Sequence, residues 1–182
     1  MKNREILYTA AMLAGKEDAA KLLSDGVPDS PASAENDVAF MRSALHYGLS
    51  EIADRRAAPV AEETLQSSGF ILYSALRDHP VKLLTVDGKE IRERRADGFF
   101  APKGTVTVRY ERRPKEGELD DEADIAPEIP PEAAVCFVAA ECASKSGLSE
   151  RQRLFLERYE RLLKTGIKSK KKLGLPAGRW RI

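Results

Sequence analysis

The stretch VKLLTVDGKEIRER, residues 81–94, decides the fold, because it predicts a β-hairpin in a chain whose periodicity is otherwise mainly helical. Two extended runs, 81–86 and 89–94, lie on either side of Asp87 and Gly88. Asp-Gly between extended runs is typical of a two-residue turn in which both central residues have positive φ. We therefore expect the two runs to pair as antiparallel neighbours.

A second β-signal follows the hairpin. Residues 102–104, Pro-Lys-Gly, predict a turn, and Val106, Val108 and Tyr110 then alternate with polar residues. Such alternation is typical of a strand with one buried face. Together these segments predict a small antiparallel sheet over about residues 70–113, inserted between helical segments.

Helical periodicity extends on both sides of this insertion. We expect helices within residues 2–58 and 131–166, the longest with one apolar face made of Val38, Met41, Leu45, Leu49 and Ile52. The expected fold class is α+β, mainly α: a bundle of about four helices with a small antiparallel sheet insertion and an extended C-terminal arm. Residues 1–166 form the expected core, and residues 167–182 form the basic arm.

Cap residues predict where the helices begin and end. Ser33 or Asn36 is expected to cap the long helix, since Ser and Asn side chains accept hydrogen bonds from the first turn. Residues 149–152, Ser-Glu-Arg-Gln, match a capping box that opens the last helix. Gly166 is expected to end that helix.

The bulk composition excludes several classes of protein. The 182 residues carry a net charge of +1, so no global field directs the whole molecule to nucleic acid or membrane. The chain has no run of about 18 apolar residues and begins without a signal-peptide core, so neither a membrane span nor secretion is expected. Cys136 and Cys142 lie on different sides of a predicted helix, which favours two buried thiols and synthesis in a reducing cytosol.

The sequence contains no recognisable catalytic or metal-binding motif. His46 and His79 have no cysteine or carboxylate at metal-ligand spacing, and neither a Gly-rich phosphate loop nor a G-x-S-x-G elbow is present. The acidic segment 115–128 lacks the spaced Asp/Asn–Gly pattern of a calcium loop. We expect no cofactor, no metal and no enzymatic activity. An enzyme would need a site assembled from residues that a single sequence cannot connect.

Two charged groups are candidate surfaces. A basic group on or near the predicted sheet contains Arg92, Arg94, Arg95, Arg109, Arg112 and Arg113. It is either a solvated face with charges that block the sheet edge, or a face toward DNA phosphates or an acidic neighbouring subunit. The acidic connector, residues 115–128, contains Glu118, Asp120, Asp121, Glu122 and Asp124. In side-by-side copies, the connector of one is expected to meet the arginines of the next.

The C-terminal arm is the third candidate. Its members are Lys168, Lys170, Lys171, Lys172, Arg179, Trp180, Arg181 and Ile182. One interpretation is a basic end without a role, and a second is nucleic-acid binding by the lysines. Against the first stands Trp180, because Trp and Arg are enriched at interface hot spots and an exposed Trp is unfavourable. We expect residues 179–182 to anchor on a protein partner while the lysines steer the encounter.

The order of elements resembles the head–tail adaptor (connector) proteins of tailed bacteriophages and prophages. The likeness covers about residues 2–166, and the stretch 104–163 carries most of it. It consists of the extended segment VTVRYERRP (106–114), the acidic connector, IPPEAA (129–134) leading into a helix, and FLERYE (155–160) on the last helix.

The resemblance implies a structural virion protein located at the head–tail neck and made in the host bacterial cytoplasm. Such adaptors assemble as a ring, typically dodecameric, beneath the portal and extend the channel for the genome. The implied partners are the portal protein, other copies of the chain, the next tail or head-completion protein, and DNA passing through the lumen without sequence specificity. A portal-docking role for about residues 168–182 is part of this implication. The alternative is a small DNA-binding or regulatory protein.

Overall fold

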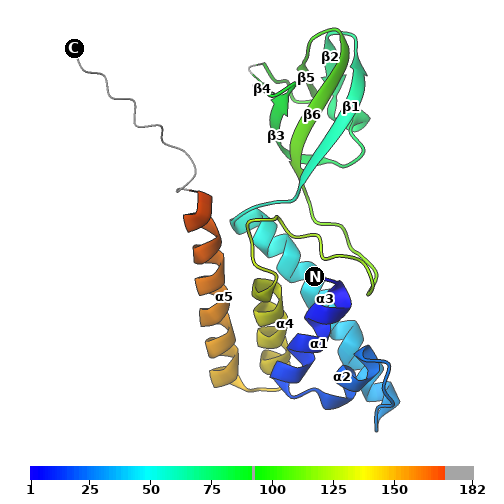
Figure 1. Ribbon diagram of the computed structural model, residues 1–182, viewed down its shortest axis with the longest axis vertical. Helices are drawn as coiled ribbons and strands as arrows, with labels where there is room; N and C mark the ends of the chain where they lie inside the picture. The colour runs from blue at the N-terminus through cyan, green and yellow to red at the C-terminus, as the bar shows by residue number, and fades with distance from the viewer. Residues whose placement is uncertain (92, 171–182) are drawn as a thin grey trace, which may run out of the picture.

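The computed structural model describes residues 1–91 and 93–170, and the side chains as far as residue 165. The fold is α+β, with five α-helices and a small antiparallel sheet in the described residues. Figure 1 shows the helices gathered in one body and the strands in a second body beyond one end of it. We call these the helical body and the sheet body. The helices are not strictly the bundle of about four helices that the sequence predicts.

The helical body is built around α4. Its elements are α1 (Asn3–Ala14), α2 (Glu17–Leu23), α3 (Pro31–Arg55), α4 (Glu132–Lys145) and α5 (Ser149–Lys170). Ten consecutive or near-consecutive residues of α4 are buried, from Ala133 to Ala143, so this helix is apolar on nearly all sides. Helices α1, α3 and α5 cover it, and the predicted apolar face of α3 is confirmed as buried.

Gly48 sets the close approach of α3 to α4. A β-carbon placed on Gly48 would lie 2.5 Å from the Cδ1 atom of Phe137, which is inside van der Waals contact. The Phe137 ring in turn lies between Tyr47 and Tyr159, with ring centroids 5.8 Å and 5.4 Å away. An aromatic row therefore crosses the helical body from exposed Tyr47 to buried Tyr159.

The sheet body contains a four-stranded antiparallel sheet in the order β1-β6-β3-β4 and a separate two-stranded pair of β2 with β5. The strands are β1 (Val60–Ser67), β2 (Phe70–Leu72), β3 (Pro80–Val86), β4 (Lys89–Glu90), β5 (Gly98–Phe100) and β6 (Gly104–Arg112), with the 3-10 turn η1 (Tyr73–Ala75) after β2. The predicted hairpin turn is confirmed, since Thr85 pairs with Glu90 and both Asp87 and Gly88 have positive φ, but the second strand ends at Glu90 rather than Arg94. Val106, Val108 and Tyr110 are buried, as their alternation predicts.

The two bodies have separate hydrophobic cores. The chain leaves the helical body after α3 and returns after β6, and these two crossings lie side by side, as Figure 1 shows. The backbone N–H of Arg112 donates to the Pro59 carbonyl oxygen over 2.9 Å at this point. The sheet body is therefore an insertion whose ends meet.

Several predicted boundaries are wrong. The sheet begins at Val60 rather than near residue 70, because β1 was not predicted. The long helix begins at Pro31, so neither Ser33 nor Asn36 is its cap. Gln152 N–H donates to the Leu148 carbonyl, which places Ser149 inside α5 rather than at its cap. Helix α5 continues past Gly166 to Lys170.

Candidate interaction surfaces

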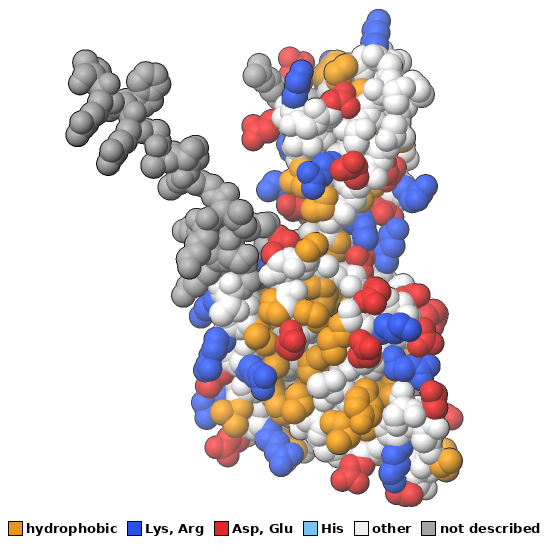
Figure 2. All heavy atoms as spheres, in the orientation of Figure 1, with side chains coloured by type: hydrophobic (Ala, Val, Ile, Leu, Met, Phe, Trp, Pro, Cys, Tyr) orange, Lys and Arg blue, Asp and Glu red, His pale blue; other side chains and the backbone are white. Residues whose placement is uncertain are grey.

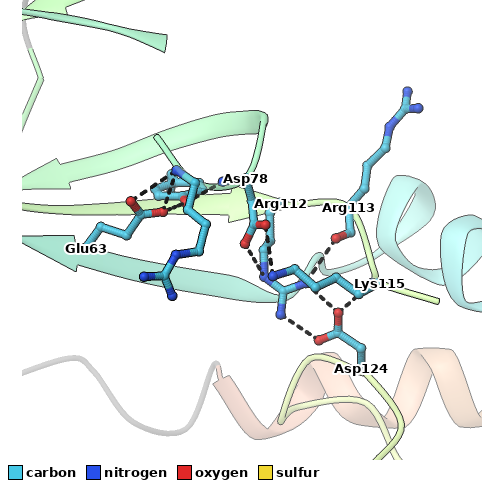
Figure 3. Close-up of polar contacts among 8 residues, drawn as sticks. Glu63, Asp78, Arg112, Arg113, Lys115 and Asp124 are labelled. Carbon is cyan, nitrogen blue, oxygen red and sulfur yellow. Dashed lines mark hydrogen bonds and ion pairs between the residues drawn. The ribbon is translucent and has the colours of Figure 1, made fainter. Parts of the chain in front are cut away.

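A cluster of charges lies where the two bodies meet. We call Asp78, Arg112, Lys115 and Asp124 the junction network. The Arg112 guanidinium binds Asp124 through two nitrogens, with 2.9 Å from Nη2 to Oδ1, and its Nε lies 3.5 Å from Asp78 Oδ2. Lys115 Nζ lies 2.9 Å from Asp78 Oδ1, and the Lys115 N–H donates to Asp124 over 2.7 Å. Figure 3 shows the four side chains converging.

The junction network joins three segments that are separate in the sequence. Asp78 follows η1 in the sheet body, Arg112 ends β6, and Lys115 and Asp124 belong to the chain that leads to α4. The side chains of Asp78, Arg112 and Asp124 are only 20%, 16% and 21% exposed. The hydrogen bonds from Arg112 to Asp124 raise the pKa of Arg112. The guanidinium therefore stays charged and holds two partly buried carboxylates together.

A second polar contact lies inside the sheet body. The Tyr110 hydroxyl donates to the Glu63 carboxylate, which also accepts a hydrogen bond from the backbone N–H of Arg77 over 3.0 Å. Burial, and then this hydrogen bond, raise the pKa of Tyr110 to about 12. Glu63 thus joins β1, β6 and the segment after η1 (Figure 3).

The predicted basic group on the sheet does not form one face. Arg109 is exposed and pairs with Glu62 over 3.3 Å, whereas Arg112 projects from the opposite side of β6 into the junction network. Arg94 donates to the Leu83 carbonyl over 3.2 Å, and the Arg95 guanidinium lies 4.9 Å from the centre of the Phe100 ring. Arg113 points away from the network in Figure 3, and Arg92 lies outside the described residues.

The acidic connector contacts its own chain. Asp124 belongs to the junction network, and Asp121 accepts the Glu118 N–H over 2.8 Å. Ion pairs join Glu118 to Arg42, Asp120 to Arg4, and Glu122 to the Met1 amino group. The side chains of Glu118, Asp120 and Glu122 are nevertheless 82%, 68% and 74% exposed. The connector therefore keeps an acidic outer surface.

Helix α5 carries a basic surface that the sequence reasoning did not identify. Arg151, Arg158 and Arg161 are exposed, and their spacing of seven and three residues places them on one side of the helix. Leu154 lies on the same side and is 52% exposed. Tyr159 and Leu163 face the core from the other side. The helical spacing of these arginines was the signal available in the sequence.

The predicted docking arm falls almost wholly outside the structure. Lys168 and Lys170 belong to α5, without described side chains, and the remaining arm residues lie outside the described part: Lys171, Lys172, Arg179, Trp180, Arg181 and Ile182.

The histidines and cysteines are not gathered in a site. His46 is half-buried on α3 and His79 is exposed before β3. Cys136 and Cys142 are buried free thiols, as predicted, and burial raises the pKa of Cys142 to about 11. Across residues 1–91 and 93–170, no three His, Cys, Asp or Glu side chains are grouped so that they could hold a metal ion. No helix in that same range has the length and apolar character to cross a bilayer.

Comparison of the sequence with models of known protein families finds no match, and comparison with curated proteins finds no match either.

Proposed function

We propose that the protein is a structural subunit of a phage or prophage head–tail neck, an adaptor that forms a ring beneath the portal. In this proposal the subunit is not an enzyme, and the ring, expected to be a dodecamer, extends the channel through which DNA passes. Its partners are the portal protein, neighbouring copies and the next tail or head-completion protein.

The observation that carries the proposal is the organisation of the chain. A helical body is interrupted by a separately cored sheet body, and the chain then returns through an acidic connector to the α4–α5 pair. Helix α5 lies at the edge of the helical body and leads directly into the basic C-terminal segment (Figure 1). This order supports an assembly subunit, because the last helix lies at the edge of the helical body and the basic segment follows it in the sequence.

Portal binding by the arm tests the proposal. The full chain should co-sediment with the portal protein encoded by the same phage or prophage, and a variant ending at Lys170 should fold but lose portal binding. Trp180→Ala should weaken binding by more than tenfold, as expected for a hot-spot anchor. The matched variant Lys171→Gln with Lys172→Gln should mainly slow association, because exposed charges act on encounter rates. Unchanged portal binding by the truncated chain would contradict the proposal.

A DNA-binding or regulatory protein is the alternative proposal. It requires basic residues free to contact phosphates, and two of the predicted ones, Arg109 and Arg112, are ion-paired within the chain. It predicts measurable duplex affinity that falls steeply with salt. A gel-shift titration at low salt distinguishes the two proposals, because an adaptor needs no sequence-independent affinity in this assay.

A further inference from the structure

We infer that the arginines of α5 form one half of a contact between copies of this chain, and that the acidic connector of the next copy forms the other half. The inference rests on the proposed function, because it names the subunit contact of the ring. We call Arg151, Arg158 and Arg161 the α5 stripe, and the outer acids Glu116, Glu118, Asp120, Asp121 and Glu122 the connector edge.

The α5 stripe has positive charge without a partner. In the part of the chain that the structure describes, Arg151, Arg158 and Arg161 make no ion pair, whereas their neighbour Arg153 pairs with Glu157 over 2.5 Å. The eleven residues from Arg151 to Arg161 span roughly 15 Å of helix. Leu154 lies between the cations and is half-exposed. A partner of opposite charge would cover the arginines and this apolar side chain together.

The connector edge has the opposite charge. Residues 115–128 contain seven acidic residues against one lysine, and the acids that pair with Arg4 and Arg42 remain more than two-thirds exposed. Exposed pairs of this kind contribute little and are easily exchanged for other partners. The connector edge can therefore accept further cations without loss of a buried contact.

The two surfaces lie on opposite edges of the helical body. In Figure 1, α5 forms one edge and the connector runs out to the other. Figure 2, in the same orientation, shows Lys and Arg along the α5 edge with some Asp and Glu among them, and Asp and Glu gathered on the opposite edge with some Lys and Arg among them. Complementary patches on opposite edges make a head-to-tail contact, which closes into a ring when the rotation between copies permits.

A second copy fits the stripe better than DNA does. The chain itself supplies the acidic complement, and its net charge of +1 provides no long-range attraction to a polyanion. Duplex binding is therefore an outcome that the test must separate from self-assembly.

Charge reversal on the full chain tests the contact. Variant one carries Arg151→Glu, Arg158→Glu and Arg161→Glu, and variant two carries Glu116→Lys, Glu118→Lys and Glu122→Lys. The wild-type chain should assemble at low salt and dissociate at high salt in sedimentation velocity. In each variant alone, like charges face each other across the contact. The affinity of self-association should therefore fall at least about a hundredfold relative to the wild type. An equimolar mixture should assemble again, because every contact then joins opposite charges.

Two further variants serve as controls for loss of fold and for the change in net charge. A chain with all six substitutions should assemble with itself, which shows that the reversed residues still support the fold. A control with Arg77→Glu, Lys89→Glu and Lys103→Glu changes the net charge equally, but in the sheet body, and should assemble like the wild type. Circular dichroism of each chain should match the wild type, since the substituted side chains are exposed.

Three results would overturn the inference: a monomeric wild type at every salt concentration, assembly of variant one alone, or a mixture that fails to assemble. Loss of assembly in the sheet-body control would also overturn it, because net charge rather than the stripe would then be responsible. If variant one loses duplex binding and the mixture restores nothing, the stripe belongs to nucleic acid. Portal binding by the arm, measured on the same chains, shows separately whether the proposed function stands.

Discussion

Glu63 is a carboxylate on the inner face of a strand, where an apolar side chain is the usual occupant. Its neighbours on that face, Ala61 and Leu65, pack against the sheet core. Glu63 is accommodated because the Tyr110 hydroxyl and the Arg77 N–H donate to it. A half-buried carboxylate is stabilised by such donors, because burial of an unpaired polar group costs free energy.

Tyr110 makes the stability of the sheet body depend on pH in the alkaline range. Its pKa is about 12 in the folded chain and about 10 when unfolded, so between these values the unfolded state binds fewer protons. Stability should therefore fall as pH rises from 10 to 12. Tyr110→Phe should be less stable at neutral pH by about 1 kcal/mol, and the difference from wild type should shrink above pH 10 in urea titrations. A constant difference across this pH range would contradict the assignment.

Gly48 is expected to tolerate no side chain. Gly48→Ala gains about 1 kcal/mol of helix propensity, but its β-carbon would overlap the Phe137 ring, and overpacking of this kind costs about 1–3 kcal/mol. We expect a net loss of about 1 kcal/mol in thermal unfolding. Combination with Phe137→Leu should make the effect of Gly48→Ala favourable, because the smaller side chain removes the overlap. An equal effect of Gly48→Ala in both backgrounds would show that the two residues do not touch.

At the scale of elements, the β3–β4 hairpin is fixed by its turn. Asp87 and Gly88 have φ of 47° and 74°, and Asp87 Oδ1 accepts the Thr107 N–H over 2.7 Å. Gly88→Ala should cost about 1 kcal/mol through conformation alone, because nothing lies within 4 Å of the added β-carbon. Asp87→Asn should be nearly neutral, since Asn tolerates positive φ and keeps an acceptor oxygen. Chemical denaturation compares the two, and equal losses would contradict this account.

The elements that could be predicted from the sequence are those whose own residues carry a local pattern. The hairpin, β6 and the apolar face of α3 depend on local turn chemistry and periodicity, and all three are confirmed. Strand β1 was not predicted because Glu63 interrupts its inner face, and the partners that make this tolerable lie 14 and 47 residues away. Helix α5 continues past Gly166 although glycine is a poor helix former, an outcome that intrinsic propensity does not give.

The charged surfaces also depend on contacts between distant residues, which the sequence alone does not give. Counting charges identified the acidic connector and the sheet arginines, but not which of them pair within the chain. Arg112 projects into the junction network because alternation along β6 places it on the side of Tyr110, opposite Arg109. The α5 stripe was open to prediction from its helical spacing. Its lack of ion-pair partners depends on where the acidic side chains of the described residues lie, which helical spacing does not give.

At the scale of the whole molecule, the junction network should couple the two bodies. Arg112→Leu leaves Asp78 and Asp124 facing each other without their shared cation, which should cost about 2–3 kcal/mol, less than a fully buried pair. Arg109→Leu on the same strand removes only an exposed pair and should cost less than about 1 kcal/mol. Hydrogen exchange in the sheet body should be faster than in the wild type for Arg112→Leu but not for Arg109→Leu. Equal protection in the two variants would rule out the coupling role.

The meeting of Pro59 and Arg112 at one point also has a consequence for how such a gene can change. A segment that leaves and re-enters a body at adjacent positions can be exchanged for another by recombination without moving any helix. The helical body and the sheet body can then evolve at different rates. The inserted body is free to change, while the helices keep their packing around α4.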